Sequence, residues 1–221
     1  MSLTMKEGGG AFTPCPAGNH VAVCYAVIDL GFQHSDAFNW EGKQIEASDR
    51  PQIMIMWEIP EETVEIDGEQ KPAVISKFYN AFFSERATLR QHLEAWRGRT
   101  FSEEELMGFN VMNVLGKACM INVVHDAKGK AKITSISALP KGMTAPRPTN
   151  PLITIDFDDF NQVSFDSLSE GIQNIIKKSP EWQAMNQPAQ GFRDQRPNQV
   201  IDQVPHWDGA PETFEDDSIP F

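Results

Sequence analysis

Aromatic and basic side chains occur together at two places along the chain and lysines gather at a third, and this combination of residue types can bind unpaired nucleic-acid bases. A flat ring stacks on a base, while Lys and Arg neutralise the phosphates beside it. The residues are Phe38, Trp40, Lys43 and Arg50 in a first loop, Lys77 and Tyr79 on a strand, and Lys128, Lys130 and Lys132 in a late hairpin. Each stacked base contributes roughly 1–3 kcal/mol, so two or three rings suffice for binding.

A second group of residues with recognisable chemistry stands at the C-terminus. An acidic run is followed by an apolar end, in the order Glu215, Asp216, Asp217, Ser218, Ile219, Pro220 and Phe221. Because this segment is rich in charge and poor in apolar residues, we expect it to be disordered. A complementary partner would offer an apolar pocket for the terminal ring, Arg or Lys for the terminal carboxylate, and a basic rim.

This C-terminal segment resembles the tip of bacterial single-stranded DNA-binding proteins, an acidic run closed by Ile-Pro-Phe that recruits replication and repair enzymes. The resemblance covers residues 214–221 and implies that Ile219, Pro220 and Phe221 dock on a partner. Ser218 stands where that family usually has another acid, which implies weaker attraction to a basic rim. The alternative is an ordinary acidic terminus.

Hydrophobic periodicity predicts the elements that position the first group of residues. Strand-like alternation covers residues 21–30, 53–59, 73–82 and 119–125, and a last strand runs through Lys132, Ile133 and Ile136. Helical spacing covers residues 84–96, and Ser102 with Glu105 forms a capping box. Trp57, Phe78 and Trp96 fall on apolar faces and are expected in the core.

Three strands, a helical segment and two more strands is the element order of the OB-fold, a small, partly open five-stranded barrel. We therefore expect a mainly β fold, with an OB barrel in residues 1–140 and its helical segment between strands three and four. Prolines at positions 140, 146, 148 and 151 mark a boundary. Residues 141–221 are expected to form a Pro-rich linker, a short helix from residue 167, and a disordered acidic tail.

Short motifs spread over residues 16–138 carry a second resemblance. They are Pro16-Ala17-Gly18 with His20, Ile28-Asp29-Leu30-Gly31, Trp57-Glu58, Leu89 with Trp96-Arg97-Gly98-Arg99, Phe101, and Leu115-Gly116-Lys117. The body is similar to the single-stranded DNA-binding replication proteins of tailed bacteriophages. This similarity implies a non-enzymatic protein of the bacterial host cytoplasm that coats single-stranded DNA in replication, recombination or repair. A homo-oligomer would raise its avidity.

The charge distribution bears on this expectation. The chain has a net charge of −12, and residues 151–221 contribute −9 of it, with 4 basic and 13 acidic residues. The body is therefore only slightly acidic, which weakens the objection that an acidic protein should not bind nucleic acid. Arginines 86, 90, 97 and 99 form either a basic helix face or ion pairs with nearby glutamates.

Other classes of protein find less support. Three cysteines, Cys15, Cys24 and Cys119, give neither a disulfide framework nor a zinc pattern, so no metal or cofactor is expected. No stretch has the length of a membrane span, and no nucleophile-elbow or phosphate-loop motif occurs. Two alternatives stay open. One is an adaptor that uses the tail without binding DNA, and the other is a nuclease using Asp156, Asp158 and Asp159.

Overall fold

A single antiparallel sheet organises the described part of the chain. The computed structural model describes residues 14–40, 43–66 and 68–186. The sheet has the strand order β5-β4-β1-β6-β7, and the short strand β8 pairs in parallel with β1. Its strands are β1 (Gly18–Ser35), β4 (Ser48–Ile66), β5 (Glu69–Asn80), β6 (Ala118–His125), β7 (Ala131–Ser137) and β8 (Ile153–Ile155). The predicted mainly β class is confirmed.

Strand β1 belongs to two neighbourhoods because its pairing changes along its length. Residues 18–23 pair with β6, whereas residues 26–28 pair with β8, and β4 pairs with β1 from Val23 to Ser35. Two register shifts, at Cys24/Ala26 and at Asp29/Gly31, accompany this change. Such bulges bend a strand and increase its twist. The bend allows one strand to serve two packing layers.

The two ends of the sheet approach each other without pairing through their backbones. The Lys77 ammonium of β5 donates to the carbonyl of Ile133 in β7, at 3.0 Å. No ladder joins these strands among the paired residues that the structure describes. The sheet is therefore open rather than closed.

The first core lies between the inner face of the sheet and the helical segment that separates β5 from β6. This segment contains α1 (Thr88–Arg97), α2 (Glu103–Met107) and the 3-10 turn η1 (Val111–Val114). Trp57 and Trp96 meet here with ring centroids 5.8 Å apart, and the Trp96 indole donates to the Ala118 carbonyl. Both tryptophans are buried as predicted, and the capping box of Ser102 and Glu105 is present.

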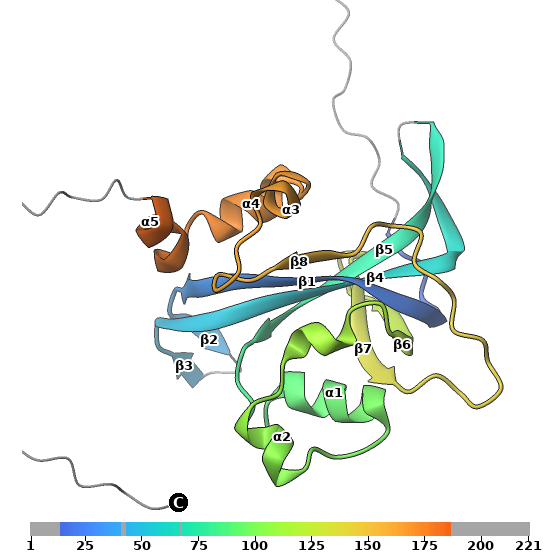
Figure 1. The fold of residues 1–221 in the computed structure, drawn as a ribbon, viewed down its shortest axis with the longest axis horizontal. Helices are drawn as coiled ribbons and strands as arrows, with labels where there is room; N and C mark the ends of the chain where they lie inside the picture. Colours follow the sequence, from blue (N-terminus) through green and yellow to red (C-terminus); the bar gives the residue numbers. More distant parts are fainter. Residues whose placement is uncertain (1–13, 41–42, 67, 187–221) are drawn as a thin grey trace, which may run out of the picture. The chain divides into compact units, whose positions relative to one another are not determined.

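The second core lies on the opposite side of β1 and β4, as Figure 1 shows. Helices α3 (Gln162–Asp166), α4 (Glu170–Ile176) and α5 (Pro180–Asn186) cover it together with β8. Phe165, Leu168 and Ile176 pack against Ile28 and Leu30 of β1. Residues 153–186 are therefore part of the body, although the sequence analysis placed a boundary at residue 140.

Glu58 fixes the chain where it returns to the sheet after β7. Its side chain is fully buried on β4. The carboxylate accepts hydrogen bonds from the backbone N–H groups of Thr149 and Asn150, and from the Asn150 amide at 2.6 Å. A buried carboxylate is tolerated when donors surround it in this way. The Pro-rich segment is thus attached to the body by a specific polar contact.

Gly31 permits the close approach of the second helical layer. Its φ angle is +67°, and a Cβ there would lie 2.5 Å from Glu181 Oε2 and 2.7 Å from Ser179 Cβ. Next to it, the Phe32 N–H donates to Glu181 Oε2 at 3.1 Å, and the Gln33 amide donates to the Ile175 carbonyl. The first strand, predicted over residues 21–30, thus continues through Gly31 to Ser35, and Gly31 lies against the start of α5.

No helix within the described residues combines the length and apolar character required to cross a membrane.

Candidate nucleic-acid interface

The edge strand β5 presents two different faces, which follow from its alternation. Ala73, Ile75 and Tyr79 point into the first core and are buried. Ser76, Phe78 and Asn80 lie on the other face and are exposed. Val74, on the same face, packs against the second core, whereas the positions of this face from Ser76 to Asn80 stay exposed. This part of the face is therefore within reach of a ligand.

A groove connects this outer face with the β6–β7 hairpin. It has a volume of about 540 Å³ and is lined by Pro14, Cys15, Met56, Val74, Ile75, Ser76, Lys128, Gly129, Lys130 and Ala131. We refer to it as the β5 groove. Its floor is apolar and its rim carries the two lysines. A strand of nucleic acid needs this combination of apolar surface and cations.

The turn of the β6–β7 hairpin is held in shape by Asp126. One carboxylate oxygen accepts from the N–H groups of Lys128 and Lys130, both at 2.9 Å. The other lies 3.1 Å from the Lys132 ammonium. The bond from Lys130, together with the Lys132 contact, lowers the pKa of Asp126. Lys132 therefore forms an ion pair with Asp126, whereas Lys128 and Lys130 are exposed at the groove.

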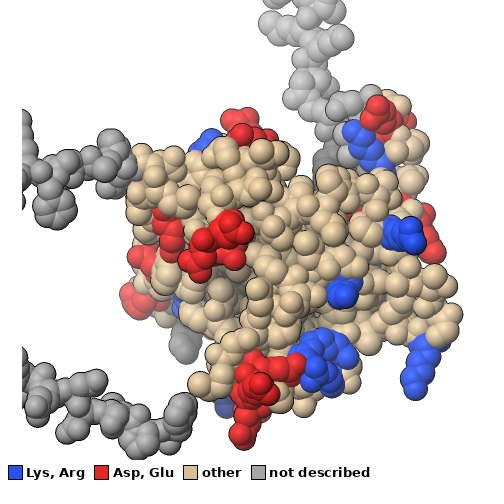
Figure 2. Space-filling view, in the orientation of Figure 1, with Lys and Arg blue, Asp and Glu red and all other residues tan. Residues whose placement is uncertain are grey.

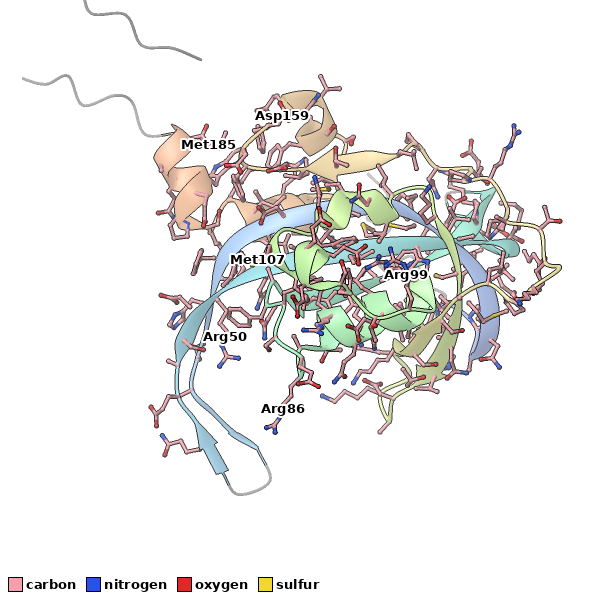
Figure 3. All side chains as sticks on the ribbon, turned by 60° about the horizontal axis from the view of Figure 1, so that its bottom comes forward. Arg50, Arg86, Arg99, Met107, Asp159 and Met185 are labelled. Atoms are coloured by element: carbon pink, nitrogen blue, oxygen red, sulfur yellow. The ribbon has the colours of Figure 1, made fainter. Side chains whose placement is uncertain are left out.

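The residues predicted in the first loop lie away from the β5 groove. Phe38, Trp40 and Lys43 belong to a hairpin formed by β2 (Phe38–Trp40) and β3 (Lys43–Ile45). The structure does not describe the side chains of these three residues. Arg50 lies at the start of β4, where this hairpin, the β2–β3 arm, joins the sheet (Figure 3). Its Nε donates to Ser48 Oγ at 3.0 Å.

Lys77 and Tyr79, the two β5 residues predicted to contact DNA, instead bond to other residues of the protein. The Lys77 ammonium is half-buried and bonded to the Ile133 carbonyl, and burial, followed by the nearby Lys132, lowers its pKa. Tyr79 is 4% exposed, and its hydroxyl is 2.9 Å from His92 Nδ1. Burial raises the pKa of Tyr79 and lowers that of His92 to about 4. Tyr79 is therefore a core residue, which corrects the expectation that it stacks on a base.

Sequence reasoning missed the aromatic residues that the outer surface does present. Phe78 is 49% exposed, which corrects its assignment to the core, and Phe82 is 44% exposed. Phe82 lines a smaller groove of about 240 Å³ with Asn80 and Arg86. The strand period contained a signal for Phe78, because it alternates with Tyr79 and so faces the opposite way. The predicted strand over residues 73–82 placed Phe82 on the same face as Phe78, although β5 ends at Asn80.

The carboxylates behind the nuclease alternative do not form a metal site. Asp156 Oδ1 accepts from the Asp158 N–H at 2.9 Å, which shapes a turn. Burial, the acidic neighbour Asp156 and then Glu181 raise the pKa of Asp29 nearby. Within residues 14–186, apart from the gaps at 41–42 and 67, no three His, Cys, Asp or Glu side chains are placed to hold a metal ion. The three cysteines are buried and unpaired.

Charged groups are unevenly distributed over the surface. Figure 2 shows acidic side chains beside α5 and over α2, while most basic ones lie over the other half of this face. Glu215, Asp216, Asp217, Ile219, Pro220 and Phe221, the predicted docking residues, lie outside the described part of the chain. Comparison with known proteins finds no match to a protein-family model, a curated protein or a solved structure.

Proposed function

We propose that this chain is a single-stranded DNA-binding protein whose body is an OB-type barrel. The strand order of the sheet carries this proposal. With β1, β4 and β5 as the first three strands and β6 and β7 as the last two, α1 falls between strands three and four, as in the OB-fold. The Lys77–Ile133 contact spans the position where strands three and five of such a barrel approach each other.

The β5 groove is the proposed binding surface. OB-folds bind oligonucleotides on the face of strands two and three and through the loops after strands one and four. These elements correspond here to β4, β5, the β2–β3 arm and the β6–β7 hairpin. Lys128 and Lys130 would contact phosphates, and Phe78 would offer its ring to a base further along β5. This assignment keeps two of the predicted lysines and replaces Tyr79 by Phe78.

Base contacts rather than charge dominate the proposed affinity. Two lysines at the groove contribute about −1.4 to the slope of log K against log salt, because each contact to a single strand contributes roughly −0.7. An exposed ring contributes about 1–3 kcal/mol through stacking. Binding should therefore weaken only moderately with salt.

Charge reversal at the hairpin tests this assignment. In fluorescence anisotropy with labelled oligothymidine, Lys128→Glu/Lys130→Glu should weaken binding at least tenfold at low salt, since attraction becomes repulsion. The matched control is Lys141→Glu/Lys178→Glu, which makes the same charge change at exposed positions outside the groove. Equal losses in the two variants would show that only net charge matters and would refute the groove.

The C-terminal residues 214–221 are proposed to recruit replication or repair enzymes, on the strength of their acidic Ile-Pro-Phe end. A peptide of these residues should compete with the whole chain for such an enzyme, and the same peptide lacking Phe221 should not. Competition by both peptides would reduce the contact to nonspecific charge attraction.

A further inference from the structure

A second pocket, on the other side of the first core, is positively charged. It has a volume of about 390 Å³ and lies between the end of α1, η1 and the start of β6. Its cationic lining residues are Arg97, Arg99 and Lys117, and no carboxylate is among the residues that line it. It shares no lining residue with the β5 groove. In a chain of net charge −12, this local excess of cations stands out.

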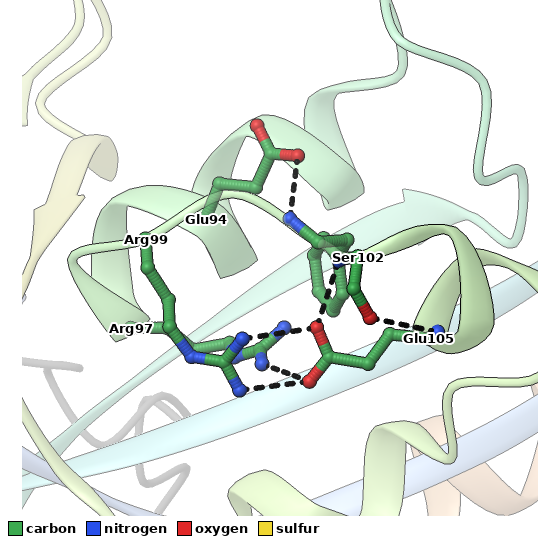
Figure 4. A network of polar contacts seen from close by, with 6 residues as sticks. Glu94, Arg97, Arg99, Ser102 and Glu105 are labelled. Carbon is green, nitrogen blue, oxygen red and sulfur yellow. Dashed lines mark hydrogen bonds and ion pairs between the residues drawn. The ribbon is translucent and has the colours of Figure 1, made fainter.

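The two arginines are held in place by Glu105 and by aromatic rings. Arg99 donates to both carboxylate oxygens of Glu105, at 3.1 and 2.8 Å, and Arg97 donates to one of them (Figure 4). The Arg97 guanidinium also lies over the Phe101 ring, 4.2 Å from its centroid. Arg97 and Arg99 therefore form ion pairs, both with Glu105, rather than an unpaired basic helix face. The single negative charge of Glu105 faces two positive guanidinium groups, so this cluster has a net positive charge.

One donor in this network has no acceptor. Arg97 Nη1 is buried and lacks a hydrogen-bond partner among the residues that the structure describes. A buried donor without a partner is unfavourable, and in native proteins such a group commonly marks the place of a water or an ion. Arg97 also lines the pocket. The network therefore contains one more donor than Glu105 satisfies.

The shape and chemistry of the pocket select the ligand. Pockets for small molecules begin at about 300 Å³, so this one holds a group of nucleotide size. Trp96, Phe109 and Val114 supply an apolar wall beside the cations. Arg99 is 61% exposed, so its guanidinium is open to solvent while its geometry is fixed by Glu105. A fixed guanidinium fork suits a phosphate group particularly well.

We propose that this pocket is a phosphate-binding subsite that holds one nucleotide of a single strand. Arg99 and Lys117 would contact the phosphate, with the sugar or base against the apolar wall. This inference rests on the proposed function and extends it, because it gives the body a second contact with the strand. Binding here is independent of sequence, since cations contact the backbone.

The test titrates the full chain with thymidine monophosphate and follows backbone amide NMR signals. Signals of Val114, Lys117 and Ala118 should shift in the unmodified chain and in Lys141→Glu, but not in Lys117→Glu. Thymidine should leave them unchanged. No shift at these three residues, or an undiminished response of Lys117→Glu, would overturn the proposal. An equal response to inorganic phosphate alone would reduce the pocket to an ion site, and a response to an acidic peptide but not to the nucleotide would identify it as a protein-docking site. Either result refutes the nucleotide assignment.

Oligothymidine binding separates this inference from the proposed function. Lys117→Glu should lower the affinity about fivefold at low salt, as expected for one exposed ionic contact. Its salt slope should become shallower by about 0.7. Loss of binding in Lys128→Glu/Lys130→Glu together with an unchanged Lys117→Glu would refute the subsite alone. The reverse pattern would refute the β5 groove and leave the subsite standing.

Discussion

Replacing Glu58 should detach the segment that leads from β7 to the second helical layer. The carboxylate is fully buried and accepts three hydrogen bonds from Thr149 and Asn150. Glu58→Ala leaves these three donors without an acceptor. Each unpaired buried donor costs about 1–3 kcal/mol, so the free energy of unfolding should fall by about 3–9 kcal/mol.

Glu58→Gln is the milder variant, and it keeps the test valid if the alanine variant does not fold. An amide retains one oxygen, which can still accept the two bonds that Asn150 makes to one carboxylate oxygen. One donor then faces an NH₂ group, so the free energy of unfolding should fall by about 1–3 kcal/mol. The control is Glu61→Gln at an exposed position of β4, where a change within about 0.5 kcal/mol is expected.

Urea unfolding followed by tryptophan fluorescence measures these free energies, and limited trypsin digestion reports on the segment itself. Lys141 is exposed near its entry and is followed by Gly142, so trypsin can cleave there, whereas Pro148 protects the bond after Arg147. Cleavage after Lys141 should be faster in both Glu58 variants than in Glu61→Gln, because local opening exposes the backbone. Equal stability and equal cleavage in Glu58→Ala and Glu61→Gln would refute the anchoring role of Glu58.

Three further predictions concern packing and titration. Gly31→Ala should lower the free energy of unfolding by about 1–3 kcal/mol more than Gly68→Ala, because both positions have a positive φ but only the Cβ at residue 31 meets Glu181 and Ser179; similar losses in urea unfolding would contradict this packing. Burial raises the pKa of the Cys15 thiol to about 11 and that of Cys24 to about 12, so a thiol reagent at pH 8 should react only after urea is added, and rapid labelling of the folded chain would be inconsistent with the core. The Ser102 N–H and then Arg99 and Arg97 lower the pKa of Glu105 to about 2, below its ordinary value of 4.5, so its stabilising contribution is complete above pH 4.5 and disappears as the pH falls towards 2. Glu105→Gln should flatten the stability curve in this window, and an unchanged curve would exclude the ion pairs.

The strands and the helical segment could be predicted because their periodicity is local. Trp57 and Trp96 lie on regular apolar faces and are buried, and Ser102 with Glu105 forms the expected capping box. The second helical layer could not be placed in the same way. Its contacts join residues far apart in the sequence, such as Ile28 with Ile176. A series of prolines looks the same whether the chain leaves the body or crosses it, and the buried Glu58 decides between these possibilities.

The candidate site was harder to predict from the sequence. The residue type shows which contacts a side chain can make, but the fold decides whether that side chain is exposed. Tyr79 and Phe78 are adjacent aromatics on one strand, and the tertiary packing decides which of them is buried. Lys77 and Lys130 are both lysines near the groove, but one bridges two strands and the other stands on a rim. Arg97 and Arg99 stand about twenty residues before Lys117, so the sequence does not indicate that the three line one pocket.

The most direct test of the central claim is a titration of the unmodified full chain into labelled oligothymidine at low salt, read by fluorescence anisotropy. We predict a saturable rise that unlabelled single strands reverse and that duplex of the same length does not. An anisotropy that stays flat up to high protein concentration, or one that duplex reverses equally well, would contradict the proposal that this sheet binds unpaired bases.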